Sequence, residues 1–411
     1  MAAAKVSQFL RGCLFTGTFA TFVGVYLSIS LLGAGIILTL LSGGILLAKE
    51  PSFSKCHPLL YPSLLLSFFI GLSILFAKPY SFGKPLEKLF YLFGLFPFTF
   101  CFSYFPRAKN TLLKLAWMLS VFLGTLGVAQ CLGLVESAPS FLNKHLKPLP
   151  ESEGLFLATG FTFHHTPFGA SLTWLFHLCL AHALLGFQKK FRSLYFLGAF
   201  LSLIGAFSSL SRGVWLSLSL STFFVLVLVS WKKTLLAGVL ALFCFFLILP
   251  RFPALKNRVH SISFNSNGER LELWKISWEM FKDSPLWGQG YHSFGERLHQ
   301  FRRAGTLYPG FPTDSHSMYL DFLSSTGAFG FIAFLVFLGS VGSCLWKTWR
   351  TSKGFEAQSW CLASLGGYSA FLIAGLFDRH FYMTQTLTCL LIFLSVICSF
   401  SMGPLKKSPE L

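Results

Sequence analysis

Long apolar runs dominate this sequence, and they constrain the fold more than any other feature. A run of about 20 mostly apolar residues is the length at which a helix crosses the hydrocarbon core of a bilayer. We therefore predict an all-α polytopic membrane protein. It has N-terminal membrane helices in residues 1–160, central ones in 161–250, a large outer loop in 251–315 and C-terminal ones in 316–411. The twelve predicted spans lie near residues 13–31, 33–48, 59–77, 89–105, 112–134, 161–187, 194–210, 213–230, 234–250, 316–344, 358–377 and 382–402.

The composition excludes a soluble domain. Hydrophobic residues make up 54% of the chain and charged residues only 12%, whereas soluble domains use roughly 25% charged residues. The 50 phenylalanines lie mostly inside the long apolar runs. Lipid is therefore the expected solvent for most of the chain.

The net charge of +18 would suit a nucleic-acid partner, but its distribution points elsewhere. If the predicted spans are right, the segments on one side of the membrane carry 17 Lys and Arg against three acidic residues, and those on the other side carry 16 against 12. Cationic loops stay in the cytoplasm. We therefore expect both termini in the cytoplasm, the 251–315 loop on the outer face, and no nucleic-acid partner.

The predicted outer loop is where we expect the chemistry. It contains nine basic and six acidic residues, and a loop of this length in a compact protein usually has a function. Residues 268–281 predict an amphipathic helix with Leu271, Trp274 and Trp278 on its apolar stripe. A second helix is predicted in 291–303.

The first polar motif is Ser208-Ser209-Leu210-Ser211-Arg212-Gly213, which interrupts two apolar spans. A guanidinium beside hydroxyl groups can bind a phosphate through two hydrogen bonds. The alternative is an arginine at a helix end that extends to the membrane surface. We favour an anion-binding function for Arg212.

The second motif begins at Asn267-Gly268-Glu269-Arg270 and continues through Asp283-Ser284-Pro285-Leu286-Trp287-Gly288-Gln289-Gly290. Arg270 is its candidate binding residue. An ordinary ion pair with Glu269 or Glu272 on the same helix explains Arg270 equally well. Spacing alone leaves these two interpretations open.

The third motif, Thr313-Asp314-Ser315-His316-Ser317-Met318-Tyr319-Leu320-Asp321, lies where the outer loop re-enters the membrane. An imidazole can take a proton from a hydroxyl group near neutral pH. A lone interfacial histidine more often only packs and forms hydrogen bonds. Asp314 and Asp321, either of which is placed to orient the ring, favour a catalytic role for His316.

Weaker signals come from His164-His165, His177, His182 and Asp378-Arg379-His380. The paired histidines lack further ligands at zinc spacing. Arg379 is a possible addition to an anion site, but a tight turn between the last two spans explains it better. The first two outer turns also lack the carboxylate clusters that hold Mg²⁺ or Mn²⁺, so we expect a metal-independent reaction without a cofactor.

The order and spacing of the three motifs resemble the O-antigen ligase and O-antigen polymerase family of bacterial membrane proteins, over about residues 161–330. The resemblance implies a glycosyltransferase C-like fold. It also implies that Arg212 and Arg270 hold the pyrophosphate of an undecaprenyl-diphosphate glycan and that His316 acts on the acceptor hydroxyl. The sequence departs from the family pattern at Ser317, where Asn is commoner, and at Ser325, where Glu often stands.

We therefore expect an inverting glycosyltransferase of the bacterial inner membrane with its active site on the periplasmic face. Its expected partners are a lipid-linked glycan donor, a lipid or glycan acceptor such as a lipid A-core sugar, and membrane lipid. A polysaccharide polymerase and a protein O-oligosaccharyltransferase would use the same residues. A transporter or flippase is the alternative from another class, but the charges lie mostly at span ends and we find no inverted repeat.

Overall fold

The computed structural model describes residues 2–77, 83–135, 146–148, 154–186, 189–248, 264–301 and 314–402. These ranges are almost entirely helical, with one isolated bridge between Pro148 and Phe156, and the predicted all-α polytopic fold is confirmed. The helices before the outer loop are α1 (Ala2–Leu27), α2 (Ile29–Lys49), α3 (Pro51–Lys55), α4 (Leu60–Ala77), α5 (Gly83–Phe93), α6 (Leu95–Tyr104), α7 (Ala108–Cys131), α8 (His165–Leu185), η2 (Lys189–Phe191), α9 (Arg192–Ser208) and α10 (Arg212–Ile248). The later helices are α12 (Phe264–Asp283), α13 (Phe294–Phe301), α14 (Met318–Thr351), α15 (Phe355–Ala374) and α16 (Thr384–Met402).

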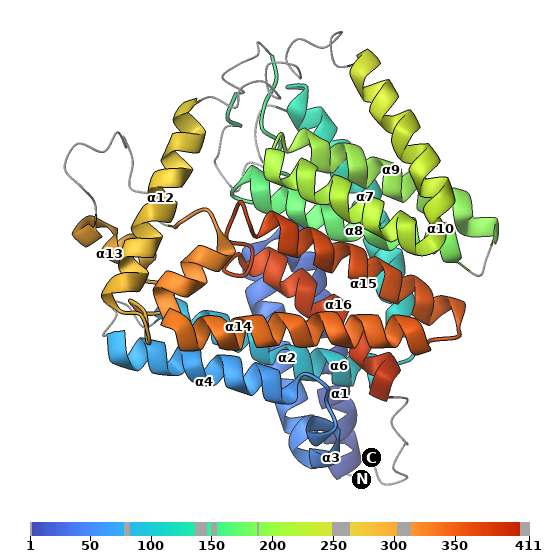
Figure 1. Ribbon diagram of the computed structural model, residues 1–411. Helices are drawn as coiled ribbons and strands as arrows, with labels where there is room; N and C mark the ends of the chain where they lie inside the picture. Colours follow the sequence, from blue (N-terminus) through green and yellow to red (C-terminus); the bar gives the residue numbers. More distant parts are fainter. Residues whose placement is uncertain are drawn as a thin grey trace.

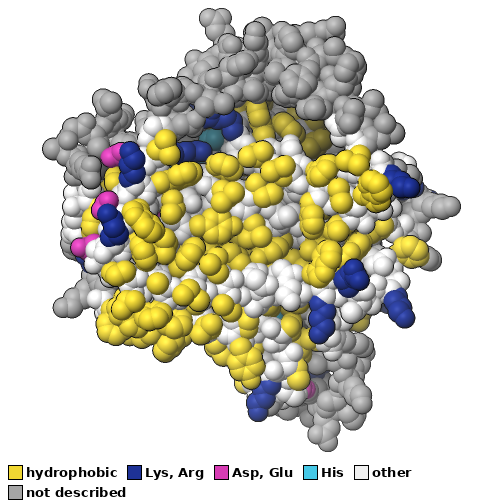
Figure 2. Space-filling model, in the orientation of Figure 1, with side chains coloured by type: hydrophobic (Ala, Val, Ile, Leu, Met, Phe, Trp, Pro, Cys, Tyr) yellow, Lys and Arg dark blue, Asp and Glu magenta, His cyan; other side chains and the backbone are white. Residues whose placement is uncertain are grey.

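The helices form an integral membrane protein. Within the described residues, eight helical segments are long and apolar enough to cross a bilayer, and two shorter apolar helices accompany them. Figure 2 shows a broad band of hydrophobic side chains, with mixed Lys, Arg, Asp and Glu at its left edge and mostly Lys and Arg at its right edge. The predicted count of twelve spans stays a prediction. The eight segments are Val6–Leu27, Ile29–Lys49, Leu86–Tyr104, Ala108–Cys131, His165–Leu185, Arg212–Lys232, Met318–Thr351 and Thr384–Met402.

Two long helices are interrupted. In α10 the backbone of Ser230 is non-helical, and this element contains the predicted span 213–230 together with residues 234–248 of the next predicted span. In α14 Gly327 breaks the helix with φ +64° and ψ −168°. The predicted span near 316–344 lies within the segment Met318–Thr351, which is long and apolar enough to cross a bilayer, and the break at Gly327 was not predicted. The first turns of α14 form a separate helical segment that begins at the third motif.

Small residues let neighbouring helices pack closely. A Cβ at Gly24 of α1 would overlap the backbone of Leu32 in α2, and one at Gly124 of α7 would overlap the backbone of Leu201 in α9. A Cβ at Gly367 of α15 would overlap the indole of Trp174 in α8. Helices in lipid associate through such close van der Waals packing, because apolar surface gains little there by leaving the solvent.

Helix α12 runs across the ends of α4 and α14, and α13 lies beside it (Figure 1). Its buried stripe consists of Leu273, Ile276 and Met280, which pack against α13. The helix predicted over 268–281 lies within α12. Leu271 and Trp278 of the predicted apolar stripe are 53% and 50% exposed, so the face that packs against α13 is a different one.

The loop after α12 is fixed to the break in α14. Gly288 and Gly327 both have positive φ, and at each of them a Cβ would overlap the backbone of the other segment. The amide of Gln289 donates to the carbonyl of Ser324 at 3.0 Å, and its side chain donates to the carboxylate of Asp283 at 2.9 Å. The glycines of the second motif therefore allow two backbones to cross in contact.

Candidate active site

The three polar motifs meet at one cavity of about 220 Å³. Arg212, Arg270 and His316 all line it, although they come from α10, α12 and the segment before α14. The other lining residues are His164, His165, Thr166, Ser211, Gly213, Val214, Ala374, Phe377, Asp378 and His380. Segments more than 200 residues apart in the sequence thus build a single polar site.

Arg212 is positioned by a sharp turn between α9 and α10. The turn includes Leu210 with φ +53°, a conformation that residues with a Cβ rarely adopt. The ring of His165 at the start of α8 donates from Nδ1 to the carbonyl of Ser209 at 2.9 Å, because a carbonyl can only accept. Arg212 is the first residue of α10, so its side chain and the amides of a helix N-terminus lie at the same cavity, an arrangement that favours anions.

Arg270 reaches the cavity from the first half of α12. Of the two acidic partners considered for it, Glu272 instead lies 4.0 Å from Lys275. Lys282 and Glu279 form another pair at 2.7 Å farther along the same helix. Within the described part of α12, the ion pairs therefore involve lysines, whereas Arg270 lines the cavity.

His316 has an unusual backbone and a carboxylate neighbour. Its φ of +51° places it in the left-handed region, where a non-glycine residue needs support from its surroundings. Asp314 gives that support, because its Oδ1 accepts the His316 amide at 3.0 Å. The same oxygen lies 3.4 Å from Nδ1 of the ring, so Nδ1 faces Asp314 and Nε2 is the ring nitrogen left for chemistry.

Arg379 holds Asp314 from the other side. Its Nε lies 2.9 Å from Oδ2 of Asp314, and the two side chains are only 22% and 11% exposed. The predicted tight turn is present as well, because the Tyr382 amide donates to the Arg379 carbonyl at 2.9 Å, and Asp378 accepts the Arg379 amide at 2.8 Å. Arg379 therefore both belongs to a turn and pairs with the carboxylate that contacts His316.

The predicted supporting residues Asp314, Asp321 and Arg379 do not line the cavity themselves. Asp314 and Arg379 pair beside His316, whereas Asp321 is buried and only 2% exposed. It lies one turn into α14, whose first residues are fixed by a bond from the Met318 amide to the Gly375 carbonyl at 2.7 Å and by one from the Tyr319 hydroxyl to the Leu372 carbonyl at 3.0 Å. The orienting carboxylate beside His316 is Asp314.

Four cavity residues, His164, His165, Asp378 and His380, received little weight in the sequence analysis. Burial lowers the pKa of His380, so that ring is held neutral. The donor atoms of Asp314, His316 and Asp378 lie within 4.8 Å of one another, a spacing that suits a metal ion, although Asp314 is already engaged by Arg379. For His164, His165, Asp378 and His380, the only sequence signal was their predicted position on the same membrane face as the other motifs.

A comparison with known protein families finds a match over the region that contains the three motifs. Residues 197–335 match the family model described as O-antigen ligase. This part of the chain is similar to the O-antigen ligase family. It includes Arg212, Arg270 and His316, and it overlaps most of the region in which the motifs resembled that family. No curated protein matches the chain.

An O-antigen ligase family segment in a chain of apolar helices indicates a glycosyl-transferring membrane enzyme of the ligase or polymerase type. Members of this family act on a lipid-linked glycan donor and an acceptor within the membrane. Among the described residues, the three polar motifs converge at this cavity.

Proposed function

We propose that this protein transfers a glycan from an undecaprenyl-diphosphate carrier to an acceptor hydroxyl group, such as that of a lipid A-core sugar. One observation carries the proposal. Arg212, Arg270 and His316, from three separate segments, line the same cavity. Cations for the leaving group and a base for the acceptor are thereby brought within one small volume.

The arginines are the proposed ligands of the pyrophosphate. Arg212 reaches it from the N-terminus of α10 and Arg270 from α12. When the bond between the anomeric carbon and the phosphate oxygen breaks, negative charge grows on the departing undecaprenyl diphosphate. Guanidinium groups already in place stabilise that charge and do the work for which other transferases use a metal ion.

His316 is the proposed general base. The acceptor oxygen attacks the anomeric carbon, its proton passes to Nε2 of His316, and undecaprenyl diphosphate leaves on the opposite face. The anomeric configuration is therefore inverted. Asp314 faces Nδ1 at 3.4 Å, and a carboxylate there favours the tautomer with a proton on Nδ1 and a free Nε2.

The proposed location is the periplasmic face of the bacterial inner membrane, with both termini in the cytoplasm. This orientation is supported by the cationic segments at the opposite helix ends. A polymerase would take a second lipid-linked glycan as acceptor, and a protein O-oligosaccharyltransferase would take a protein hydroxyl. Supplying these acceptors one at a time separates the three activities.

The test is transfer by the purified protein in detergent, given undecaprenyl-diphosphate oligosaccharide and candidate acceptors in the presence of EDTA. We expect activity that survives EDTA and falls sharply in Arg212→Ala, Arg270→Ala and His316→Ala. Matched controls on the same elements or loop are Lys232→Ala on α10, Lys275→Ala on α12 and His299→Ala on α13. Full activity of His316→Ala refutes the base, and no transfer from any lipid-linked donor favours a transporter.

A further inference from the structure

A second and larger cavity lies at the other end of the helices that build the candidate active site. Its volume is about 690 Å³, and it is lined by residues of α7, α8, α9 and α15. Helices α8 and α15 line both cavities. His165 of α8 and Ala374 of α15 line the active-site cavity, whereas His182 of α8 and Glu356 of α15 line the second cavity. A helix of 21 residues is about 30 Å long, so the two cavities open on opposite faces of the membrane.

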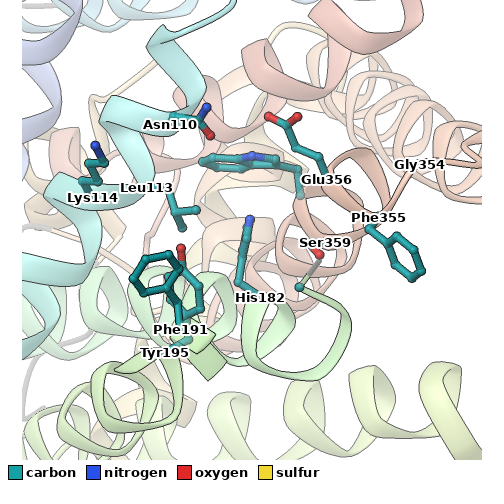
Figure 3. Close-up of a pocket in the computed structure, with 12 residues that line it drawn as sticks. Asn110, Leu113, Lys114, His182, Phe191, Tyr195, Gly354, Phe355, Glu356 and Ser359 are labelled. Atoms are coloured by element: carbon teal, nitrogen blue, oxygen red, sulfur yellow. The ribbon is translucent and has the colours of Figure 1, made fainter. Parts of the chain in front are cut away.

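Polar groups of opposite character face each other across this second cavity. Figure 3 shows Asn110 and Lys114, one turn apart on α7, on one side, and Glu356 and Ser359 of α15 on the other, with His182 between them. Lysine and the asparagine amide donate hydrogen bonds, whereas a carboxylate accepts them. One wall therefore suits an anion and the other suits a cation that donates hydrogen bonds.

Two buried polar atoms at this cavity have no hydrogen-bond partner within the described part of the chain. His182 is 6% exposed, and its Nδ1 lies 2.9 Å from the Leu178 carbonyl, so Nδ1 carries the hydrogen and Nε2 of the neutral ring can only accept. Among the described residues, neither His182 Nε2 nor the Ser359 hydroxyl has a hydrogen-bond partner. Buried polar atoms are nearly always satisfied, so His182 Nε2 indicates a ligand group that donates, and the Ser359 hydroxyl is able to accept from the same group.

The mouth of the cavity is apolar. Phe191 and Phe355 are 39% and 55% exposed, and Leu113 and Tyr195 complete the wall. This end of the protein carries cationic residues, among them Lys190, Arg192 and Lys353. Such residues mark the cytoplasmic face. An occupant with a polar head and an apolar body in the cytoplasmic leaflet fits this arrangement.

We infer that the second cavity binds the headgroup of a phospholipid that contains both a phosphate and a primary ammonium, as phosphatidylethanolamine does. The phosphate binds Lys114 and Asn110. The ammonium donates to Glu356, to the Ser359 hydroxyl and to His182 Nε2, and the glycerol and acyl chains leave past Phe191 and Phe355. A choline headgroup has no N–H to donate, and a glycerol headgroup has no charge for Glu356.

The test is native mass spectrometry of the full chain in detergent with phosphatidylethanolamine, phosphatidylcholine or phosphatidylglycerol of identical acyl chains. We expect preferential retention of phosphatidylethanolamine, weakened roughly tenfold by Lys114→Ala and by Glu356→Gln, since each removes one charge-assisted hydrogen bond. Lys190→Ala, which removes an exposed charge at the same face without lining the cavity, should change nothing.

Three results would overturn the inference. Equal retention of phosphatidylcholine would show that binding does not require an ammonium that donates hydrogen bonds. Tighter retention of phosphatidylglycerol would indicate a site for anionic lipid. Binding of soluble glycerophosphoethanolamine as strong as that of the lipid would show a site for a free metabolite. Because the readout is binding, it is independent of whether the protein transfers a glycan.

Discussion

The ion pair between Asp314 and Arg379 should control catalysis through the position of His316. Asp314→Ala removes the acceptor of the His316 amide, the neighbour of the ring and the partner of Arg379 together. Both side chains are less than one quarter exposed, so the charge-assisted bond at 2.9 Å is worth about 1.5–3 kcal/mol. If that free energy holds the ring in place, its loss lowers kcat roughly 10- to 100-fold.

The assay is a double-mutant cycle on glycan transfer, with kcat and the donor KM measured separately. We expect Asp314→Ala and Arg379→Ala each to lower kcat while KM changes little, and the double variant to be no slower than the worse single one. Asp314→Asn, which keeps an acceptor for the His316 amide, should fall less than Asp314→Ala. A double variant whose loss equals the product of both single losses would refute this coupling and indicate that Arg379 contacts the donor itself.

Three further predictions concern the fold and donor binding. Gly327→Ala should lower the free energy of unfolding by about 3 kcal/mol or more, because a Cβ meets the backbone of the outer loop at positive φ; an unchanged thermal melting temperature would contradict the crossing. Burial lowers the pKa of His57 to about 4, so the folded state binds fewer protons than the unfolded state below pH 6.5. The free energy of unfolding should therefore be highest above pH 6.5 and fall by at most about 3 kcal/mol as pH drops from 6.5 to 4. Thermal unfolding of His57→Gln across this range checks the assignment, since the variant should lose that dependence. Arg270→Lys should raise the donor KM about tenfold because it loses the planar two-bond contact with phosphate, while Lys275→Ala should leave the KM unchanged.

The membrane helices and the three motifs were predictable because both are local signals. A span needs only a run of apolar residues, and Arg212 stands out as a single charge between two such runs. His316 stands out in the same way at a loop end. Their convergence was predictable only as far as topology goes, because topology assigns residues to a membrane face and gives no distance between them.

The features that were missed depend on contacts between distant segments. The break at Gly327 forms where the loop after α12 crosses α14, and no local sequence period reports that crossing. Arg379 meets Asp314 only because the start of α14 is bonded to the end of α15. The buried face of α12 has the same origin, since contacts with α13 decide which residues of α12 are buried.

The charge at the candidate site also explains why the base and the arginines belong together. Arg212, Arg270 and Asp378 line the cavity and the Asp314–Arg379 pair lies beside it, so three arginines meet two carboxylates and the site has a small formal excess of positive charge. During transfer, His316 gains a proton just as negative charge grows on the departing diphosphate. The positive charge of the site therefore rises at the moment it is needed, which stabilises the transition state more than the bound donor. A neutral substitute for His316 that still binds acceptor should for this reason slow the chemical step without weakening donor binding.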